Sequence, residues 1–216
     1  MRDAFRTIAG PASARLTRNR SRFLSFARCV RSEDEAAKAI AEFRKTYHDA
    51  SHVCSAYRLF GDQAGISGSD DDGEPSGSAG EPILRRIEGA ELENVLVAVV
   101  RYYGGVNLGV GGLIRAYGDA AEEALDAAKQ VSKAIQTSIC IEFPPDVTSG
   151  VMGTIHRLAA VVKRIEYDAA GLAEVSLPPS RIEAFLAALR EATGARARTS
   201  TCDGKAEEAT EVEVRE

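Results

Sequence analysis

The sequence SDDDGEPSGSAGEP at residues 69–82 and the sequence VVRYYGGVNLGVGGLIRAYG at residues 99–118 decide how this chain is interpreted. Nine of its nineteen glycines lie between Gly73 and Gly112. Glycine weakens helices and strands, so this density indicates backbone that turns tightly or that another group approaches closely. We therefore expect the rest of the chain to hold these two glycine-rich blocks in place.

The second block has the strand, turn and helix order of an anion-binding site. A continuous apolar run at residues 94–100 predicts a central strand that is covered on both faces. The turn after it would present free N–H groups at a helix N-terminus, with Arg101 and Arg115 on either side. The nucleotide-binding motifs are absent, because Val110 stands where GxxxxGK[ST] needs lysine and Ile114 where GxGxxG needs its third glycine.

The first block is acidic. Asp71, Asp72 and Glu74 carry the oxygen ligands that Mg²⁺ prefers, so a magnesium site is one interpretation. The EF-hand spacing is not met, because with Gly73 as the sixth residue the twelfth position is Ala79. The alternative is an acidic loop whose aspartates cap local turns.

The histidine cluster of the chain is HDASHVC at residues 48–54. His48 and His52 have H-x-x-x-H spacing, while His52 and Cys54 are spaced to lie on one face of a strand. No glutamate follows His48, so the HExxH protease pattern is absent. Two interpretations remain. One is a histidine–cysteine nucleophile pair, and the other is a set of buried polar residues with hydrogen bonds beneath the glycine loop.

The residues around the two blocks alternate between strand and helix patterns. Residues 22–30 alternate as a strand, and residues 52–60 are rich in strand formers. Ser32 and Glu35 form an S-x-x-E capping box that opens a helix. Residues 61–80 are expected to form a long loop without regular structure, of the functional or mobile kind.

The second half has a complete pattern of its own after a boundary near residues 130–136. Strands are expected at residues 137–143, 161–167, 172–177 and 195–202. Helices are expected at residues 148–160 and after a second capping box, Ser180 and Glu183. The order β-α-β-β-α-β is the ferredoxin-like order.

The charge of the chain is unevenly distributed. The net charge of −5 excludes a general polyanion binder, although a local basic patch remains compatible with it. Residues 1–31 hold eight arginines and one acid. This segment is either a solvated start or a phosphate-facing patch made of some of Arg15, Arg18, Arg20 and Arg22.

The four cysteines are widely spaced and form no CxxC motif, so a zinc knuckle or a dithiol redox site is not expected. No apolar signal region and no run long enough to span a membrane is found. We therefore expect a soluble, cytoplasmic protein with reduced cysteines.

The combination of HDASHVCSAY, DDGEPSGSAG and VVRYYGGVNLGVGGLIRAY resembles the IMPACT/YigZ family, in particular its bacterial two-domain members. The resemblance covers residues 21–125 and, more weakly, the second half. It implies an α+β protein with a ribosomal protein S5 domain 2-like domain at residues 1–132. It further implies a ferredoxin-like domain, similar to domains of elongation factor G, at residues 133–203, before an acidic tail at residues 204–216.

The same resemblance implies a role in translation. Eukaryotic relatives restrain a stress kinase that phosphorylates an initiation factor, by binding a ribosome-associated activator of that kinase. Two positions depart from the family pattern: Ser78 stands where threonine is usual, and Asn107 where a basic residue is common. The second departure weakens a phosphate-contact role for the loop.

Two functions follow as hypotheses. The first is a non-enzymatic translation-associated regulator that binds the ribosome, RNA or a translation factor and no membrane. The alternative is a metal-assisted enzyme acting on a phosphorylated or acyl substrate, with Mg²⁺ as the possible cofactor and no identified catalytic residue. Both place the two glycine blocks on one surface. Its candidate residues are His48, His52, Asp71, Asp72, Gly73, Glu74, Ser76, Gly77, Arg101, Tyr102, Gly104, Gly105, Gly109, Gly111, Gly112 and Arg115.

Overall fold

The computed structural model describes residues 2–61 and 65–202, and contacts within them divide the chain into two units. The N-terminal unit is Arg6–Val131. The C-terminal unit contains residues 132–202 together with residues 2–5 at the start of the chain. The expected acidic tail at residues 204–216 lies outside the described residues.

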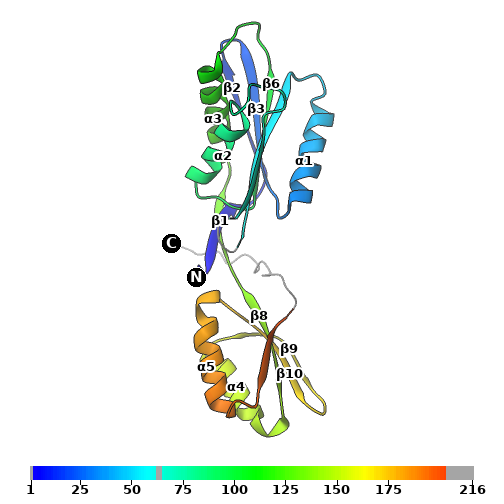
Figure 1. Ribbon diagram of the computed structural model, residues 1–216, viewed down its shortest axis with the longest axis vertical. Helices are drawn as coiled ribbons and strands as arrows, with labels where there is room; N and C mark the ends of the chain where they lie inside the picture. The colour runs from blue at the N-terminus through cyan, green and yellow to red at the C-terminus, as the bar shows by residue number, and fades with distance from the viewer. Residues whose placement is uncertain (1, 62–64, 203–216) are drawn as a thin grey trace. The chain divides into compact units, whose positions relative to one another are not determined.

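The N-terminal unit is built on a five-stranded antiparallel sheet with three helices. In sheet order its strands are β2 (Ala12–Arg18), β3 (Ser21–Cys29), β6 (Val95–Tyr102), β4 (His52–Leu59) and β5 (Ile66–Asp70). Helix α1 (Glu33–Thr46) covers one face, while α2 (Gly80–Gly89) and α3 (Val110–Asp126) cover the other (Figure 1). A separate two-stranded sheet pairs β1 (Ala4–Ile8) with β7 (Gln130–Ala134).

Strand β6 occupies the centre of this sheet, as its apolar run predicts. Val95, Val97 and Val99 join the core cluster on the side of α2 and α3. Leu96 and Ala98 face the other side, in the clusters that contain residues of α1. All of them are completely buried. Burial on both faces explains why the strand is apolar throughout instead of alternating.

The C-terminal unit is a four-stranded antiparallel sheet with two helices, and its order β-α-β-β-α-β agrees with the prediction. In sheet order its strands are β11 (Arg198–Thr201), β8 (Thr137–Phe143), β10 (Gly171–Leu177) and β9 (Val161–Tyr167). Its helices are α4 (Thr148–Arg157) and α5 (Ile182–Thr193), preceded by the short 3₁₀ helices η1 (Pro145–Val147) and η2 (Pro179–Arg181). Residues of both helices share one core cluster with β8 and β10.

Of the two predicted capping boxes, one is confirmed and one is wrong. The Ser32 hydroxyl accepts the Glu35 N–H at 3.2 Å and begins α1. Ser180 does not cap α5, because both its N–H and its hydroxyl donate to the Asp3 carboxylate, at 2.9 and 2.5 Å. The carboxylate of Asp3, near the start of the chain, takes the place that the Glu183 carboxylate has in a capping box. The spacing of Ser180 and Glu183 does not reveal this distant acceptor.

Three segments contain strands that were not predicted, and one of these strands is β7, at the expected boundary between the two halves. Residues 61–80 are not all loop, since Ile66–Asp70 forms the edge strand β5 beside β4. The arginine-rich start is also structured, because Ala12–Arg18 pairs along its whole length with β3. The inward residues of β2 include Ala12 and Ala14, whose small side chains give a weak alternation signal.

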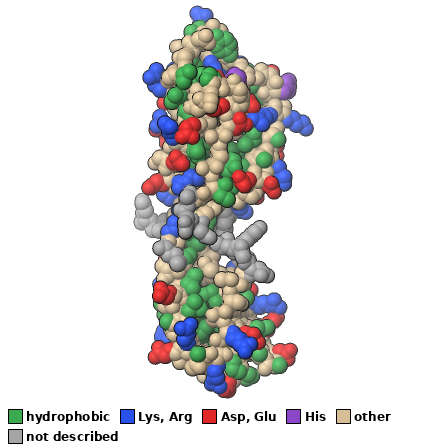
Figure 2. All heavy atoms as spheres, viewed as in Figure 1, with side chains coloured by type: hydrophobic (Ala, Val, Ile, Leu, Met, Phe, Trp, Pro, Cys, Tyr) green, Lys and Arg blue, Asp and Glu red, His purple; other side chains and the backbone are tan. Residues whose placement is uncertain are grey.

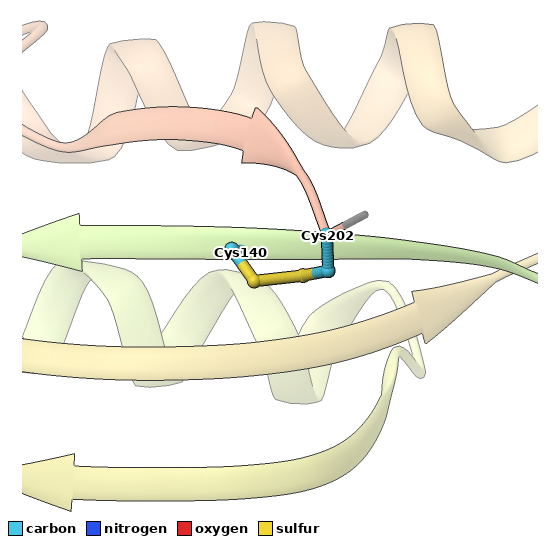
Figure 3. The surroundings of a disulfide bond; sticks show 2 residues. All are labelled: Cys140 and Cys202. Carbon is cyan, nitrogen blue, oxygen red and sulfur yellow. A yellow bond between two sulfur atoms is a disulfide. The ribbon is translucent and has the colours of Figure 1, made fainter. Parts of the chain in front are cut away.

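The expectation of four reduced cysteines is also wrong. Cys140 on β8 and Cys202 directly after β11 form a disulfide (Figure 3). It connects the edge strand β11 to its neighbour β8 across 62 residues of sequence. Cys29 and Cys54 are free. Strand pairing, which wide sequence spacing conceals, brings the two bonded cysteines within reach.

Candidate functional site

Asp71 fixes the first glycine-rich block to the start of α2. Its carboxylate accepts the N–H groups of Gly77, Ala79 and Gly80, at 2.7, 2.9 and 2.8 Å. Burial raises the pKa of Asp71, but the three N–H donors outweigh burial and hold the pKa below its ordinary value. Gly77 has a φ of 73°, which favours glycine at this turn. The ionised carboxylate of Asp71 therefore has a structural role, which is to hold the loop in its conformation.

Asp72 fixes the same block to the central sheet. Its carboxylate accepts the Val53 N–H at 2.7 Å and the Arg44 guanidinium at 2.8 Å. Its carbonyl oxygen lies 2.7 Å from Nδ1 of His52. A carbonyl only accepts, so Nδ1 of His52 donates this hydrogen bond. Gly73, at a φ of 85°, then turns the chain directly beside this imidazole ring.

Glu74 forms the buried centre of the site. Its Oε1 accepts one hydrogen bond from Nη1 of Arg101 at 2.5 Å and another from the Tyr117 hydroxyl at 2.7 Å. The side chains of Glu74 and Arg101 are only 4% and 6% exposed. Nε2 of His52 lies 3.9 Å from the same oxygen. The acidic loop, strand β6 and helix α3 thus meet at one carboxylate.

Cys54 lies within this centre but is not an activated nucleophile. Its thiol is buried and donates to the Asp71 carbonyl at 3.0 Å. Burial raises the pKa of the Cys54 thiol well above its ordinary value, and nearby Glu74 and Asp72 raise it further. Nucleophilic attack needs the thiolate. The geometry therefore favours the hydrogen-bonding interpretation of the His52 and Cys54 pair.

Protein groups contact the carboxylates that were proposed as metal ligands. Both carboxylate oxygens of Asp71 and Oε1 of Glu74 accept hydrogen bonds from the protein, and the Arg44 guanidinium binds the Asp72 carboxylate. Across residues 2–61 and 65–202, no group of three or more His, Cys, Asp or Glu side chains is arranged to hold a metal ion. The hypothesis of a Mg²⁺ site gains no support from this geometry.

The second glycine-rich block forms an exposed turn. A Cβ at Gly104 would stand 2.1 Å from the backbone carbon of Arg20, so only glycine fits between the two segments. Gly105 and Gly109 have φ values of 80° and 66°. Gly109 precedes α3 without a side-chain cap, and Gly111 and Gly112 lie in the first turn of that helix. These glycines allow the turn to pack on the β2–β3 connection and to reverse into α3.

The exposed surface at this end of the unit, which we call the glycine tip, consists of residues 18–22 and 103–115. Arg20, Arg22 and Arg115 are exposed on it, and no acidic residue occurs in either segment. Its exposed large hydrophobic side chains are Tyr103, Val106, Val110 and Ile114. Hydrophobic and basic side chains gather at the upper end of the N-terminal unit in Figure 2. The glycine tip is therefore both apolar and positively charged.

The structure separates the predicted site residues into two groups. Glu74 and Arg101 form the buried network, and the partly exposed His52, Asp71 and Asp72 contact it. The exposed Gly73 and Gly77 lie at its margin. The glycines of the second block and Arg115 belong to the glycine tip. Two predicted residues belong to neither group, because His48 and Ser76 are exposed in turns. Tyr102 lies at the margin of the glycine tip, where Arg22 stands over its ring and its hydroxyl donates to Asp49.

Two tyrosines were missed as site residues. Tyr117 is not among the candidate residues that the sequence yields. It is fully buried, and burial, with Cys54 and Glu74 beside it, raises the pKa of its hydroxyl. Its isolation among alanines was a usable signal, since a buried tyrosine hydroxyl needs a partner. Tyr103 is 49% exposed at the glycine tip, which no sequence pattern distinguishes from its neighbour.

Comparison with known proteins places this chain among bacterial and eukaryotic relatives. Residues 19–125 match the Impact N-terminal domain. The IMPACT family member YigZ of Escherichia coli is 34% identical over 159 residues, which cover 73% of this chain and 78% of that protein. The IMPACT family member YvyE of Bacillus subtilis is 38% identical over 126 residues, 58% of each chain. A crystal structure of a hypothetical protein superposes with a TM-score of 0.67 at 26% identity, over 95% of this chain and all of that one.

Proposed function

Because this chain belongs to the IMPACT family, we propose that it is a non-enzymatic regulator associated with translation that binds the ribosome through its glycine tip. The observation that carries the proposal is the separation of charge between the two glycine blocks. The acidic block turns its carboxylates to internal donors. The glycine tip, which joins the second block to residues 18–22, leaves Arg20, Arg22 and Arg115 exposed.

The chemistry of the glycine tip suits a partner rich in phosphate. Exposed arginines without neighbouring acids attract polyanions, even on a protein whose net charge is negative. Within the described residues, Arg20 and Arg115 form no ion pair, whereas Arg18 nearby is paired with Asp119. Ribosomal RNA supplies the phosphates that such arginines bind.

The buried network has a supporting role in this proposal. Glu74, Arg101 and Tyr117 connect the loop, the central strand and α3, so they determine where the glycine tip stands. Arg101, proposed from the sequence as a partner contact, has a side chain that is only 6% exposed. Its contribution to binding is therefore indirect. Gly104, Gly105 and Gly109 contribute by allowing the shape of the turn.

The fold assignments of the two units form part of the same proposal. We assign the N-terminal unit to the fold of the second domain of ribosomal protein S5. The C-terminal unit is assigned to the ferredoxin-like domains found in elongation factor G, and its strand order β11-β8-β10-β9 supports this. No helix among residues 2–61 and 65–202 has the length and apolar character needed to cross a membrane. We propose the cytoplasm, where ribosomes are found, as the place of action.

Salt-dependent sedimentation with purified bacterial ribosomes tests the proposal. We expect the wild-type protein to co-sediment at low salt and to dissociate as salt rises. Changing Arg20, Arg22 and Arg115 together to Glu should abolish binding. As the matched control, the exposed Arg157, Arg190 and Arg198 of the C-terminal unit are changed to Glu. Absence of salt-sensitive binding by the wild type, or equal loss in both triple variants, would refute the proposal.

A further inference from the structure

Both the backbone and the ring of Tyr103 have partners at the glycine tip. The backbone N–H donates to the Ser51 hydroxyl at 3.0 Å. The guanidinium carbon of Arg101 lies 5.4 Å from the ring centroid. Arg101 is 5% exposed, whereas Tyr103 is 49% exposed, so the exposed ring surface is the part that Arg101 does not cover. Tyr103 thus presents an aromatic surface to solvent, while the buried Arg101 contacts its ring from the protein side.

Arg101, which contacts the Tyr103 ring, also belongs to the buried network. The same Arg101 guanidinium lies 5.7 Å from the Phe23 ring and bonds Glu74 at 2.5 Å. A cation fixed beneath an aromatic ring is attracted to its face and restrains the ring. The exposed ring is consequently ordered before any partner arrives, which lowers the entropy cost of binding on it.

Two exposed arginines, Arg20 and Arg22, contact the residues on either side of Tyr103 in the chain. Gly104, the residue after Tyr103, donates its N–H to the Ser21 hydroxyl at 3.2 Å and packs against the backbone of Arg20. The guanidinium of Arg22 stands 4.8 Å over the ring of Tyr102, the residue before Tyr103. The chain neighbours of Tyr103 therefore contact residues 20–22, at the turn between β2 and β3 and the first residues of β3.

We propose that Tyr103 is a stacking platform for an unpaired RNA base, and that Arg20 and Arg22 bind the phosphates next to that base. This inference rests on the proposed function, because it names the part of the ribosome that the glycine tip would bind. Aromatic rings stack on bases of any sequence, while arginines bind the backbone. A double helix hides its base faces, so the site selects single-stranded RNA.

Binding of labelled RNA oligonucleotides tests this inference directly. The probes are a 10-nucleotide single strand with one central 2-aminopurine and the same strand in a duplex. We expect the wild type to prefer the single strand and to change the fluorescence of 2-aminopurine on binding. Tyr103→Phe, which keeps the ring, should retain affinity, and Tyr103→Leu should weaken it roughly tenfold. Tyr167→Leu, at a tyrosine 63% exposed in the C-terminal unit, is the control and should bind as wild type does.

The outcomes separate this inference from the proposed function. Equal affinity for single strand and duplex, or unchanged binding by Tyr103→Leu, overturns the stacking platform. If ribosomes still co-sediment with Tyr103→Leu as with wild type, the contact is made to ribosomal protein or to paired RNA, and the proposed function stands alone. If the wild type binds the single strand through Tyr103 but not ribosomes, the proposed function fails while the stacking platform is upheld.

Discussion

Replacing Glu74 with Gln tests the buried centre of the N-terminal unit. The change leaves the charge of Arg101 without its partner, although the arginine side chain is only 6% exposed. Removal of one member of a buried ion pair costs about 3–5 kcal/mol. In a domain of this size each kcal/mol lowers the melting temperature by roughly 4 °C, so a decrease of roughly 10–20 °C is expected.

Urea unfolding followed by far-ultraviolet circular dichroism measures this effect, because the chain has no tryptophan to report by fluorescence. The double variant Glu74→Gln with Arg101→Met removes both charges. It should be more stable than Glu74→Gln alone, since no unpaired buried charge remains. The control is Glu122→Gln, whose side chain is 49% exposed and pairs with Arg86 at 3.2 Å. It should change stability by less than about 1 kcal/mol.

Two results would refute the reasoning about Glu74. One is a loss of less than about 1 kcal/mol in Glu74→Gln, similar to the surface control. The other is strict additivity, in which the double variant loses the sum of both single losses. Either result would mean that the charges of Glu74 and Arg101 are not coupled in the folded protein.

Three further predictions concern the loop, the turn and the disulfide. Asp71→Asn should lower stability by about 0.5–2 kcal/mol near pH 7. The pKa of Asp71 is lowered by folding, so its contribution is complete above the ordinary value of 3.8 and is lost as the pH falls through the folded value; the difference between wild type and variant should therefore shrink below about pH 4 in denaturation curves. Gly104→Ala should lower both the melting temperature and the affinity for ribosomes, because the new Cβ would stand 2.1 Å from the backbone of Arg20. Gly111→Ala is the control and should be tolerated, since a Cβ there meets no neighbouring residue within 4 Å. Equal effects of the two variants in melting scans would contradict the close approach at Gly104. Thiol titration of the unfolded, unreduced protein should detect two thiols, those of Cys29 and Cys54, and four after reduction of the Cys140–Cys202 disulfide. Reducing the disulfide should lower the free energy of unfolding by about 2–4 kcal/mol. Four reactive thiols before reduction would contradict the bond.

Elements with a strong period or a long apolar run were predictable from the sequence. The central strand β6, the capped helix α1 and the order of the C-terminal unit all follow from local patterns. Elements held by distant partners were not. Strand β5 has the sequence ISGSD, which carries no apolar alternation, and it forms because β4 pairs with it. The same reason explains the missed contact between Asp3 and Ser180.

The candidate site was predictable in composition but not in the direction of its side chains. The glycine density marked two segments that both turn tightly in the structure, and Asp71 caps a local turn as one interpretation predicted. Sequence spacing could not show that Arg101 points into the protein and that Tyr103 stands exposed above it. The direction of each side chain depends on the pairing of β6 with β3 and β4. The sequence therefore did not predict that the Arg101 side chain is buried, which makes direct contact with a partner unfavourable for it.

Site-specific photocrosslinking tests most directly whether the glycine tip is the contact surface. A photoreactive residue is placed at Asn107, which is exposed in the turn before α3, and in a separate variant at Glu88, which is exposed on α2. Each variant is irradiated in complex with ribosomes, and the RNA and protein adducts are mapped. We predict crosslinks to ribosomal RNA from position 107 and none above background from position 88. Crosslinks from position 88 alone, or equal yields from both positions, would contradict the account.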